Sequence, residues 1–202
     1  MRFPDPYTHP GLAPGFESVT LIDNDPIISD RMSNNTVLEV RNSAQYWGIS
    51  IPLPDMFPDE FFLIDGFLSE YKRTQGFIEV LLPQYESFGI QGDVKNATVP
   101  SGQKGNSITM KVPNLRALPK VGGLFKFANH YKVYKITSAS SNGDNLTIGI
   151  YPNLFITTSG AEKPIFNGIL FQTKAVGLEN YKSVLNADGM YESFTINLEE
   201  SK

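Results

Sequence analysis

The stretch "FKFANHYKVYKITSA" (residues 125–139) decides how this sequence is interpreted, because it suits either a ligand-binding platform or a core hairpin. Four aromatic residues and three lysines lie within its first eleven positions. Exposed rings beside cations are typical of surfaces that stack nucleic-acid bases or sugars. The same rings on one buried face would indicate only a β-fold.

A turn at Asn129–His130 predicts which residues of this stretch share a face, because directly paired residues of a hairpin point to the same side. One face would carry Phe125, Phe127, Tyr134 and Ile136, with Lys132 near the turn. The other face would carry Leu124, Lys126, Ala128, Tyr131, Val133 and Lys135. Most of the rings are therefore grouped with isoleucine, which favours a core hairpin. Tyr131, with Lys126 and Lys135 beside it, is the remaining candidate for binding a saccharide or a single strand.

Short apolar stretches separated by proline and glycine run through the rest of the chain, and this spacing of strand-like segments and turn residues is typical of all-β proteins. The expected strands are residues 17–22, 36–51, 76–83, 107–112, 123–128, 131–138, 145–151, 168–174 and 193–199. Asn-Gly or Asp-Gly dipeptides, which accept the backbone of tight turns, occur at residues 142–143, 167–168 and 188–189.

One segment, "FPDEFFLIDGFLSEYKRTQG" (57–76), predicts a helix instead. Pro58 suits the first helical position, and acidic residues follow it while basic residues precede the end, as the helix dipole favours. Apolar residues recur at helical spacing on one face: Phe61, Ile64, Phe67, Leu68 and Tyr71. Gly76 is the expected stop. This helix is expected to cover a sheet.

The polar, turn-rich stretch 92–107 indicates a division of the chain, with a boundary near residue 89. The second unit would run from about residue 89 to residue 173 and contain about five short strands. Strands of that number and length suit a small closed barrel such as an OB-fold.

The composition excludes several functional classes. The chain of 202 residues has no cysteine and a formal net charge of −4, so it lacks thiolate metal sites and a general attraction to nucleic acid. No signal peptide or membrane-spanning run is found. Its two histidines, His9 in a proline-rich arm and His130 at an expected turn tip, form no metal or serine-triad signature. We therefore predict no enzyme and no cofactor, although a hydrolase of surface glycans, which needs only two carboxylates, stays open.

Several long runs resemble the distal tail proteins of siphophages, most of all the small two-domain type of T-five-like phages. The strongest run is "AQYWGISIPLPDMFPDEFFLIDGFLSEYKRTQGFIEVLLPQYESFGIQGD" (44–93). The opening thirty residues, "HYKVYKIT" (130–137) and "YPNLFITTSGAEKPIFNGILFQTK" (151–174) extend the similarity. Its specificity lies in the length and order of the match rather than in one motif.

The resemblance implies a structural protein rather than an enzyme. Distal tail proteins form a homohexameric ring that joins the tail tube protein to the tail tip hub and lets DNA pass without specific binding. A ring-forming β-sandwich with one flanking helix would comprise residues 1–88 with 174–202, and an OB-fold-like domain residues 89–173. Such a protein is made in the host cytoplasm, resides at the distal end of the virion tail and inserts in no membrane.

The residues are compatible with this role and with one rival. An acidic chain avoids counterion-driven binding of DNA, and a ring subunit needs head-to-tail surfaces, here expected at the β edges of the first domain. Trp47, the only tryptophan, is interpreted as core rather than interface. The alternative is a carbohydrate- or single-strand-binding module of the OB type that uses Tyr131, Lys126 and Lys135.

Overall fold

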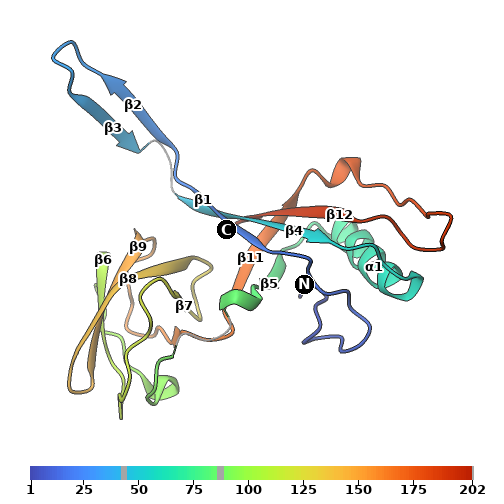
Figure 1. Cartoon of the computed structure of the whole chain (residues 1–202). Coiled ribbons are helices and arrows are strands. Elements are labelled where there is room, and N and C mark those ends of the chain that lie inside the picture. Colours follow the sequence, from blue (N-terminus) through green and yellow to red (C-terminus); the bar gives the residue numbers. More distant parts are fainter. Residues whose placement is uncertain (42–44, 86–88, 202) are drawn as a thin grey trace. The chain divides into compact units, whose positions relative to one another are not determined.

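The computed structural model describes residues 1–41, 45–85 and 89–201 (Figure 1). The chain divides into two compact units, Met1–Ile78 with Thr173–Ser201 and Glu79–Gln172. Strands dominate both units, so the predicted mainly-β, two-domain fold is confirmed. The predicted domain limits, at residues 88/89 and 173/174, stay a prediction, and residues 86–88 lie outside the described part.

A five-stranded sheet in the order β1-β4-β12-β11-β5 organises the first unit, and its strands β11 and β5 continue into residues of the second unit. The strands are β1 (Thr20–Asn24), β4 (Tyr46–Leu53), β12 (Phe194–Glu200), β11 (Leu170–Val176) and β5 (Ile78–Leu81). Alternate side chains of the two central strands are buried on one face: Trp47, Ile49, Ile51, Leu53, Ile196 and Leu198. The interpretation of Trp47 as a core residue is confirmed, since 2% of it is exposed.

Helix α1 (Pro58–Thr74) confirms the predicted helix and forms the second layer of this core. Its buried residues are Phe61, Ile64, Leu68 and Tyr71. The Tyr71 hydroxyl accepts a hydrogen bond from the Ala175 amide of β11 at 3.0 Å, which joins the helix to the sheet. In the described part of this unit the sheet therefore packs against a helix, whereas a sandwich of two sheets was expected.

Helix α1 ends at Thr74, and its C-cap is Gln75, the residue before the predicted stop Gly76. Gln75 adopts a left-handed backbone with φ of 50°, and its amide donates to the Tyr71 carbonyl at 2.7 Å. At the other end the Glu60 carboxylate accepts the Phe57 amide at 2.9 Å and satisfies a donor that the helix leaves free.

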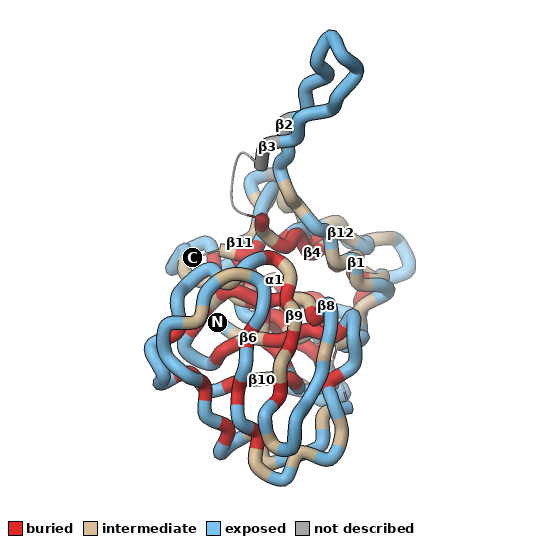
Figure 2. Tube along the Cα trace, turned by 90° about the vertical axis from the view of Figure 1, so that its left-hand side faces the viewer, coloured by how far each residue is buried: buried red, intermediate tan, exposed pale blue. Residues whose placement is uncertain are grey.

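A two-stranded hairpin, which we call the arm (residues 27–41), extends the β1–β4 ribbon beyond the sheet (Figures 1 and 2). Its strands β2 (Ile27–Arg31) and β3 (Val37–Arg41) pair only with each other, with Ile27 opposite Arg41. The single strand expected over 36–51 is therefore two strands, separated by residues 42–44, which lie outside the described part. Strand β2 was not predicted from the sequence.

The second unit contains a five-stranded antiparallel sheet in the order β10-β7-β8-β9-β6. The strands are β10 (Pro164–Ile165), β7 (Leu124–Phe127), β8 (Val133–Asn142), β9 (Asn145–Leu154) and β6 (Gly105–Lys111). The predicted pairs Phe125–Tyr134 and Lys126–Val133 are confirmed. Phe125, Phe127, Tyr134 and Ile136 share one buried cluster, so the core interpretation of the hairpin is confirmed as well.

The described strands of this sheet remain open, with β10 and β6 at its edges, whereas the strand count suggested closure. A bulge between Ile136 and Ser138 bends β8 against β9. Gly149 lies opposite the bulge, where an added Cβ would collide with the Ser138 and Thr137 hydroxyl oxygens. Any larger residue would therefore require these side chains to move. Short 3₁₀ turns occur at Pro83–Tyr85, Val94–Asn96 and Leu178–Asn180.

Candidate functional site

The three residues predicted to bind a ligand lie on the hairpin of the second unit, and all are half-buried. The Lys126 ammonium donates to the Leu170 carbonyl at 3.0 Å. The Tyr131 ring stands edge-on to Phe155, with ring centroids 5.7 Å apart. Lys135 lies on β8 and shares its side of the sheet with Lys126. Binding through these residues stays a prediction, which a strand-binding titration or a glycan array of the wild-type chain would test.

His130 does not lie at an exposed turn tip as predicted, because 4% of it is exposed. The ladder stops at Lys126–Val133, and the His130 amide closes a turn onto the Phe127 carbonyl at 3.1 Å. The turn therefore centres on residues 128–129, and the His130 ring packs edge-on against Phe127, with centroids 5.1 Å apart. A shift of one residue in the turn moves the imidazole into the core.

His130 forms a buried pair with Glu162, with 3.7 Å between Nε2 and Oε1. The Glu162 carboxylate also accepts the Ser159 amide at 2.7 Å, the Ser159 hydroxyl at 2.9 Å and the Gly160 amide at 2.8 Å. The Ser159 hydroxyl donates to the carboxylate, and no hydrogen bond joins it to the imidazole in the described part of the chain. This arrangement holds a loop and is not a nucleophile with its base.

Burial and hydrogen bonds act in opposite directions on this pair. Burial disfavours the charged form of Glu162, but the donors of the loop outweigh it and lower its pKa to about 2. Burial lowers the pKa of His130, an effect that the Glu162 charge opposes. At neutral pH the pair is therefore a carboxylate beside a neutral imidazole, which suits a structural role.

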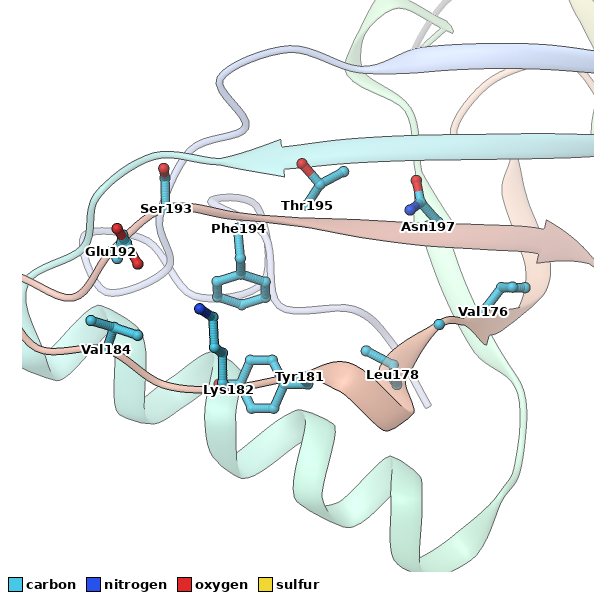
Figure 3. A pocket seen from close by; sticks show the side chains of 11 residues that line it. Val176, Leu178, Tyr181, Lys182, Val184, Glu192, Ser193, Phe194, Thr195 and Asn197 are labelled. Carbon is cyan, nitrogen blue, oxygen red and sulfur yellow. The ribbon is translucent and has the colours of Figure 1, made fainter.

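A pocket of about 220 Å³ lies in the first unit between the 176–184 segment and β12 (Figure 3). The Tyr181 hydroxyl donates to Asp65 at 2.9 Å, and its ring stands edge-on to Phe194. Burial and the Asp65 bond raise the pKa of Tyr181, so its hydroxyl stays neutral. The lining residues all come from the stretch 176–197, which showed no recognisable motif in the sequence. The lining includes Lys182, Glu192 and Ser193, but in the described part no hydrogen bond or ion pair joins these three side chains into a catalytic arrangement.

Within the described ranges, no group of three or more histidine, aspartate or glutamate side chains is placed to hold a metal ion. No helix of the described chain is long and apolar enough to cross a membrane.

The arm is the first of two exposed apolar surfaces on the first unit. Its large apolar residues Ile27, Met32, Val37 and Leu38 are each between 46% and 50% exposed. Figure 2 shows exposed residues along its length. Monomeric proteins rarely expose such a concentration of apolar side chains without an interaction to make.

The second surface, which we call the aromatic patch (Phe57, Phe62, Leu185 and Tyr191), lies around the start of α1. Phe57 is 62% exposed, and Phe62 and Leu185 are each 59% exposed. The Tyr191 ring stacks on Phe61 with centroids 3.8 Å apart and meets Phe62 edge-on. Backbone bridges join Tyr191 to Met56 and to Leu185, which ties the loop before β12 to the helix.

The remaining broad surface is the open face of the first unit's sheet, opposite its buried face. Ser50 and Asn197 form a cross-strand hydrogen bond there at 2.9 Å. Lys174 lies directly opposite Glu199, so the two charges face each other across neighbouring strands. Ile22 and Val176, which are 43% and 46% exposed, lie on the same side of the sheet, so this face is nearly neutral in charge and mixes polar with apolar side chains.

Exposed apolar surfaces beside a one-sided sheet are typical of a subunit that assembles with other proteins. Residues 3–85 match the family described as distal tail protein pb9, A domain, N-terminal, and residues 86–169 match the family described as distal tail protein pb9, B domain. The chain is 53% identical over 205 residues to the distal tail protein pb9 of Escherichia phage T5, covering the full length of both chains.

The chain thus belongs to the pb9 family of distal tail proteins. The resemblance found in the sequence is confirmed. The protein is a structural component of a phage tail, located in the virion tail, and is not an enzyme.

Proposed function

We propose that six copies of this chain form a ring at the distal end of the tail, between the tail tube protein and the tail tip hub. The observation that carries the proposal is the one-sided sheet: its buried face belongs to the subunit's own core, and its open face and edges are left for assembly. The subunits would be made in the host cytoplasm and join the tail there.

The topology supports head-to-tail association. Strands β1 and β5 stand at opposite edges of the sheet, so one copy offers two different edges to its neighbours. Contacts between unlike surfaces close into rings when the rotation between copies divides a full turn. The number six is what the family resemblance implies.

The near-neutral charge of the open face supports the passage of DNA through the ring. Neutralising phosphates with lysine and arginine is the main source of non-specific DNA binding. This face offers Lys174 directly opposite Glu199, and the whole chain has a net charge of −4. A channel lined in this way would let DNA slide through without holding it.

Gold-labelled antibodies to the wild-type chain test the proposal on particles from the source culture. We expect gold at the far end of the tails, at the junction of tube and tip. Image averaging of the labelled junction should then reveal six-fold symmetry. Gold along the whole tube would contradict the distal location, and a symmetry other than six would contradict the hexamer.

A further inference from the structure

We propose that the pocket beside β12 is a slot in which an extended segment of a different tail protein docks and adds a short strand to β12. The slot is the gap between β12 and residues 177–183, with a volume of about 220 Å³. The inference uses only the place of this chain in a phage tail, which its family shows, and does not depend on the number of copies in the ring.

The slot exists because the neighbouring chain leaves β12 and returns to it. Strand β11 pairs with β12 as far as Val176. The chain comes back where the Val184 carbonyl accepts the Glu192 amide at 2.9 Å. Between these two contacts, residues 177–183 run beside the shorter stretch 193–196, so the longer segment bows away from the strand.

The main chain of Thr195 points into the slot. Pro52 lies opposite Thr195 in the ladder of β4 and β12, and its carbonyl accepts the Glu17 amide at 3.2 Å on the side of β1. Because paired residues of an antiparallel ladder alternate between facing each other and facing away, Thr195 turns its N–H and C=O away from β4. The Ala175 amide donates to the Tyr71 hydroxyl rather than to β12, which fixes the same alternation from the β11 side.

The edge that Thr195 presents is available for pairing. Across the described ranges, no hydrogen bond joins the Thr195 backbone to residues 177–183. A strand edge with free N–H and C=O groups is a template on which an extended peptide can pair as a further strand. A peptide main chain offers one acceptor and one donor at the spacing that this edge requires, which is why the slot suits a peptide.

The side chains of the slot suit an uncharged segment with an apolar residue. The half-buried rings of Tyr181 and Phe194 stand edge-on, with centroids 5.2 Å apart, and Figure 3 shows the Phe194 ring pointing from β12 towards the 176–184 segment. The Asp65 bond holds the Tyr181 ring in place. Among the lining residues, Lys182 and Glu192 carry one charge of each sign, so neither an anion nor a cation is favoured.

The shape of the slot selects a segment from a different protein. Residues 193–196 span about 13 Å at 3.3 Å per residue, so a segment of about three or four residues fits beside them. Residues 177–183 close the far side, so the incoming segment has no room for a partner strand of its own. Each strand of the described chain already pairs with another strand. A second copy therefore offers no unpaired strand, and the partner is a tail protein that does.

Hydrogen exchange at the Thr195 amide tests the docking in the wild-type chain. In the isolated subunit this amide should exchange as fast as those of exposed loops, and in purified tails its exchange should be about tenfold slower or more. The Asn197 amide, which faces Val176 on β11, is the matched control and should be protected in both samples. A Thr195 amide that exchanges equally fast in tails, or that is already protected in the isolated subunit, would overturn the proposal.

A photo-crosslink identifies the source of the segment. The exposed Lys182 at the rim is replaced by the photoreactive residue p-benzoylphenylalanine, and purified tails are irradiated and analysed by mass spectrometry. The same residue at Val121, which is 64% exposed in the second unit, is the control. We expect crosslinks from position 182 to one segment of a different tail protein, absent from the control. Crosslinks only within or between copies of this chain, or none in tails that contain the variant, would overturn the proposal.

Thr195→Pro, added to the photoreactive chain, tests whether the main chain makes the contact. Proline lacks the N–H and is tolerated where that group points away from the ladder, so the variant should fold. Its crosslinking per incorporated chain should fall to the level of the Val121 control, whereas Thr195→Val keeps the amide and should crosslink fully. Equal crosslinking by both variants would contradict strand addition. The exchange measurement on the wild-type chain stands whether or not the proline variant folds.

Discussion

Glu162 illustrates how one buried carboxylate organises a loop in this protein. Its oxygens accept two amides and one hydroxyl from Ser159 and Gly160, so it replaces hydrogen bonds that the loop would otherwise make to water. The cost of burying the charge is offset by these donors, which bond the ionised form more strongly than the protonated form. Ionisation of this one group is therefore linked to the folding of its loop.

Acid should destabilise the second unit through Glu162. The pKa of this carboxyl is lowered from 4.5 to about 2 by folding, which corresponds to about 3 kcal/mol of stability. Because the folded-state pKa is lowered, this contribution is complete above pH 4.5 and is lost as the pH falls towards 2. Glu162→Gln should be less stable at neutral pH and lose less of its stability between pH 5 and pH 2. Urea denaturation followed by circular dichroism measures both.

Ser159→Ala is the matched control, because it removes the hydroxyl donor and keeps the carboxylate and the amides. It should retain most of the acid sensitivity. An equal acid sensitivity of wild type and Glu162→Gln would show that other carboxylates carry the effect.

His130 should act in a separate pH range. Its pKa in the folded chain lies below 6.5 because the ring is buried, so the unfolded chain takes up the proton first. The stability that the neutral ring contributes is complete above pH 6.5 and declines as the pH falls below that value. His130→Gln should remove this decline. A titration of the two histidine ring signals by NMR checks the direction of the shift, with His9→Gln to assign them.

At the scale of single elements, helix α1 contains an unfavourable residue at its C-terminal cap. Gln75 adopts φ of 50°, a conformation that glycine enters without a steric cost, and Gly76 follows one position too late to take this role. Gln75→Gly should therefore raise the free energy of unfolding of the first unit by about 0.5–1 kcal/mol. Denaturation followed by the fluorescence of Trp47, which belongs to this unit, is the measurement.

Gln75→Ala separates the backbone effect from the loss of the side chain. Alanine keeps the Cβ that disfavours the left-handed conformation, so this variant should gain nothing. An equal gain from both substitutions would mean that the glutamine side chain, not its backbone, is the unfavourable feature.

Helices and strands that bury one face could be predicted from the sequence, because their apolar residues recur at a regular spacing. A strand that is exposed on both faces could not. Helix α1 and strand β12 each bury one face, which leaves a period in the sequence, and both were predicted within one or two residues. The arm buries neither face in the described chain. Strand β2 therefore has no such period, and its Asp30, Arg31 and following polar residues are typical of a loop.

The same limit applies to the candidate site. The pairing rules of hairpins predicted the register of β7 and β8 correctly. They also placed Phe125, Phe127 and Tyr134 together in the core, as the structure has them. The burial of His130 depended on a one-residue change in turn position, which pattern alone does not determine. The aromatic patch joins helix α1 to residue 191, more than a hundred positions away, through contacts that only the folded chain reveals.

At the scale of the whole molecule, surfaces used for folding and surfaces left for assembly are separate. The central strands of the first sheet, β4 and β12, bury one face against the helix and leave the other polar. Several exposed apolar residues gather on the arm and on the patch, and two more, Ile22 and Val176, lie on the open face itself. A subunit built in this way can fold alone and still present unlike surfaces to two neighbours.

Removing the arm should therefore abolish assembly and leave folding intact. Ile27 and Arg41 lie opposite each other, so an Asn-Gly turn between them can replace residues 28–40. None of the described side chains in that stretch is buried, and a shorter loop costs less closure entropy. We expect the free energy of unfolding, followed by Trp47 fluorescence, to stay within about 1 kcal/mol of the wild type.

The shortened chain should nevertheless be absent from tails when it is expressed beside the wild-type chain during infection. Immunoblots of purified particles with an epitope-tagged copy measure its incorporation, and a tagged full-length chain is the matched control. A shortened chain that enters tails as well as the control would mean that the ring is held by its sheet edges alone. A large loss of stability would instead assign the arm to the folding core, and its exposed apolar residues would then need another explanation.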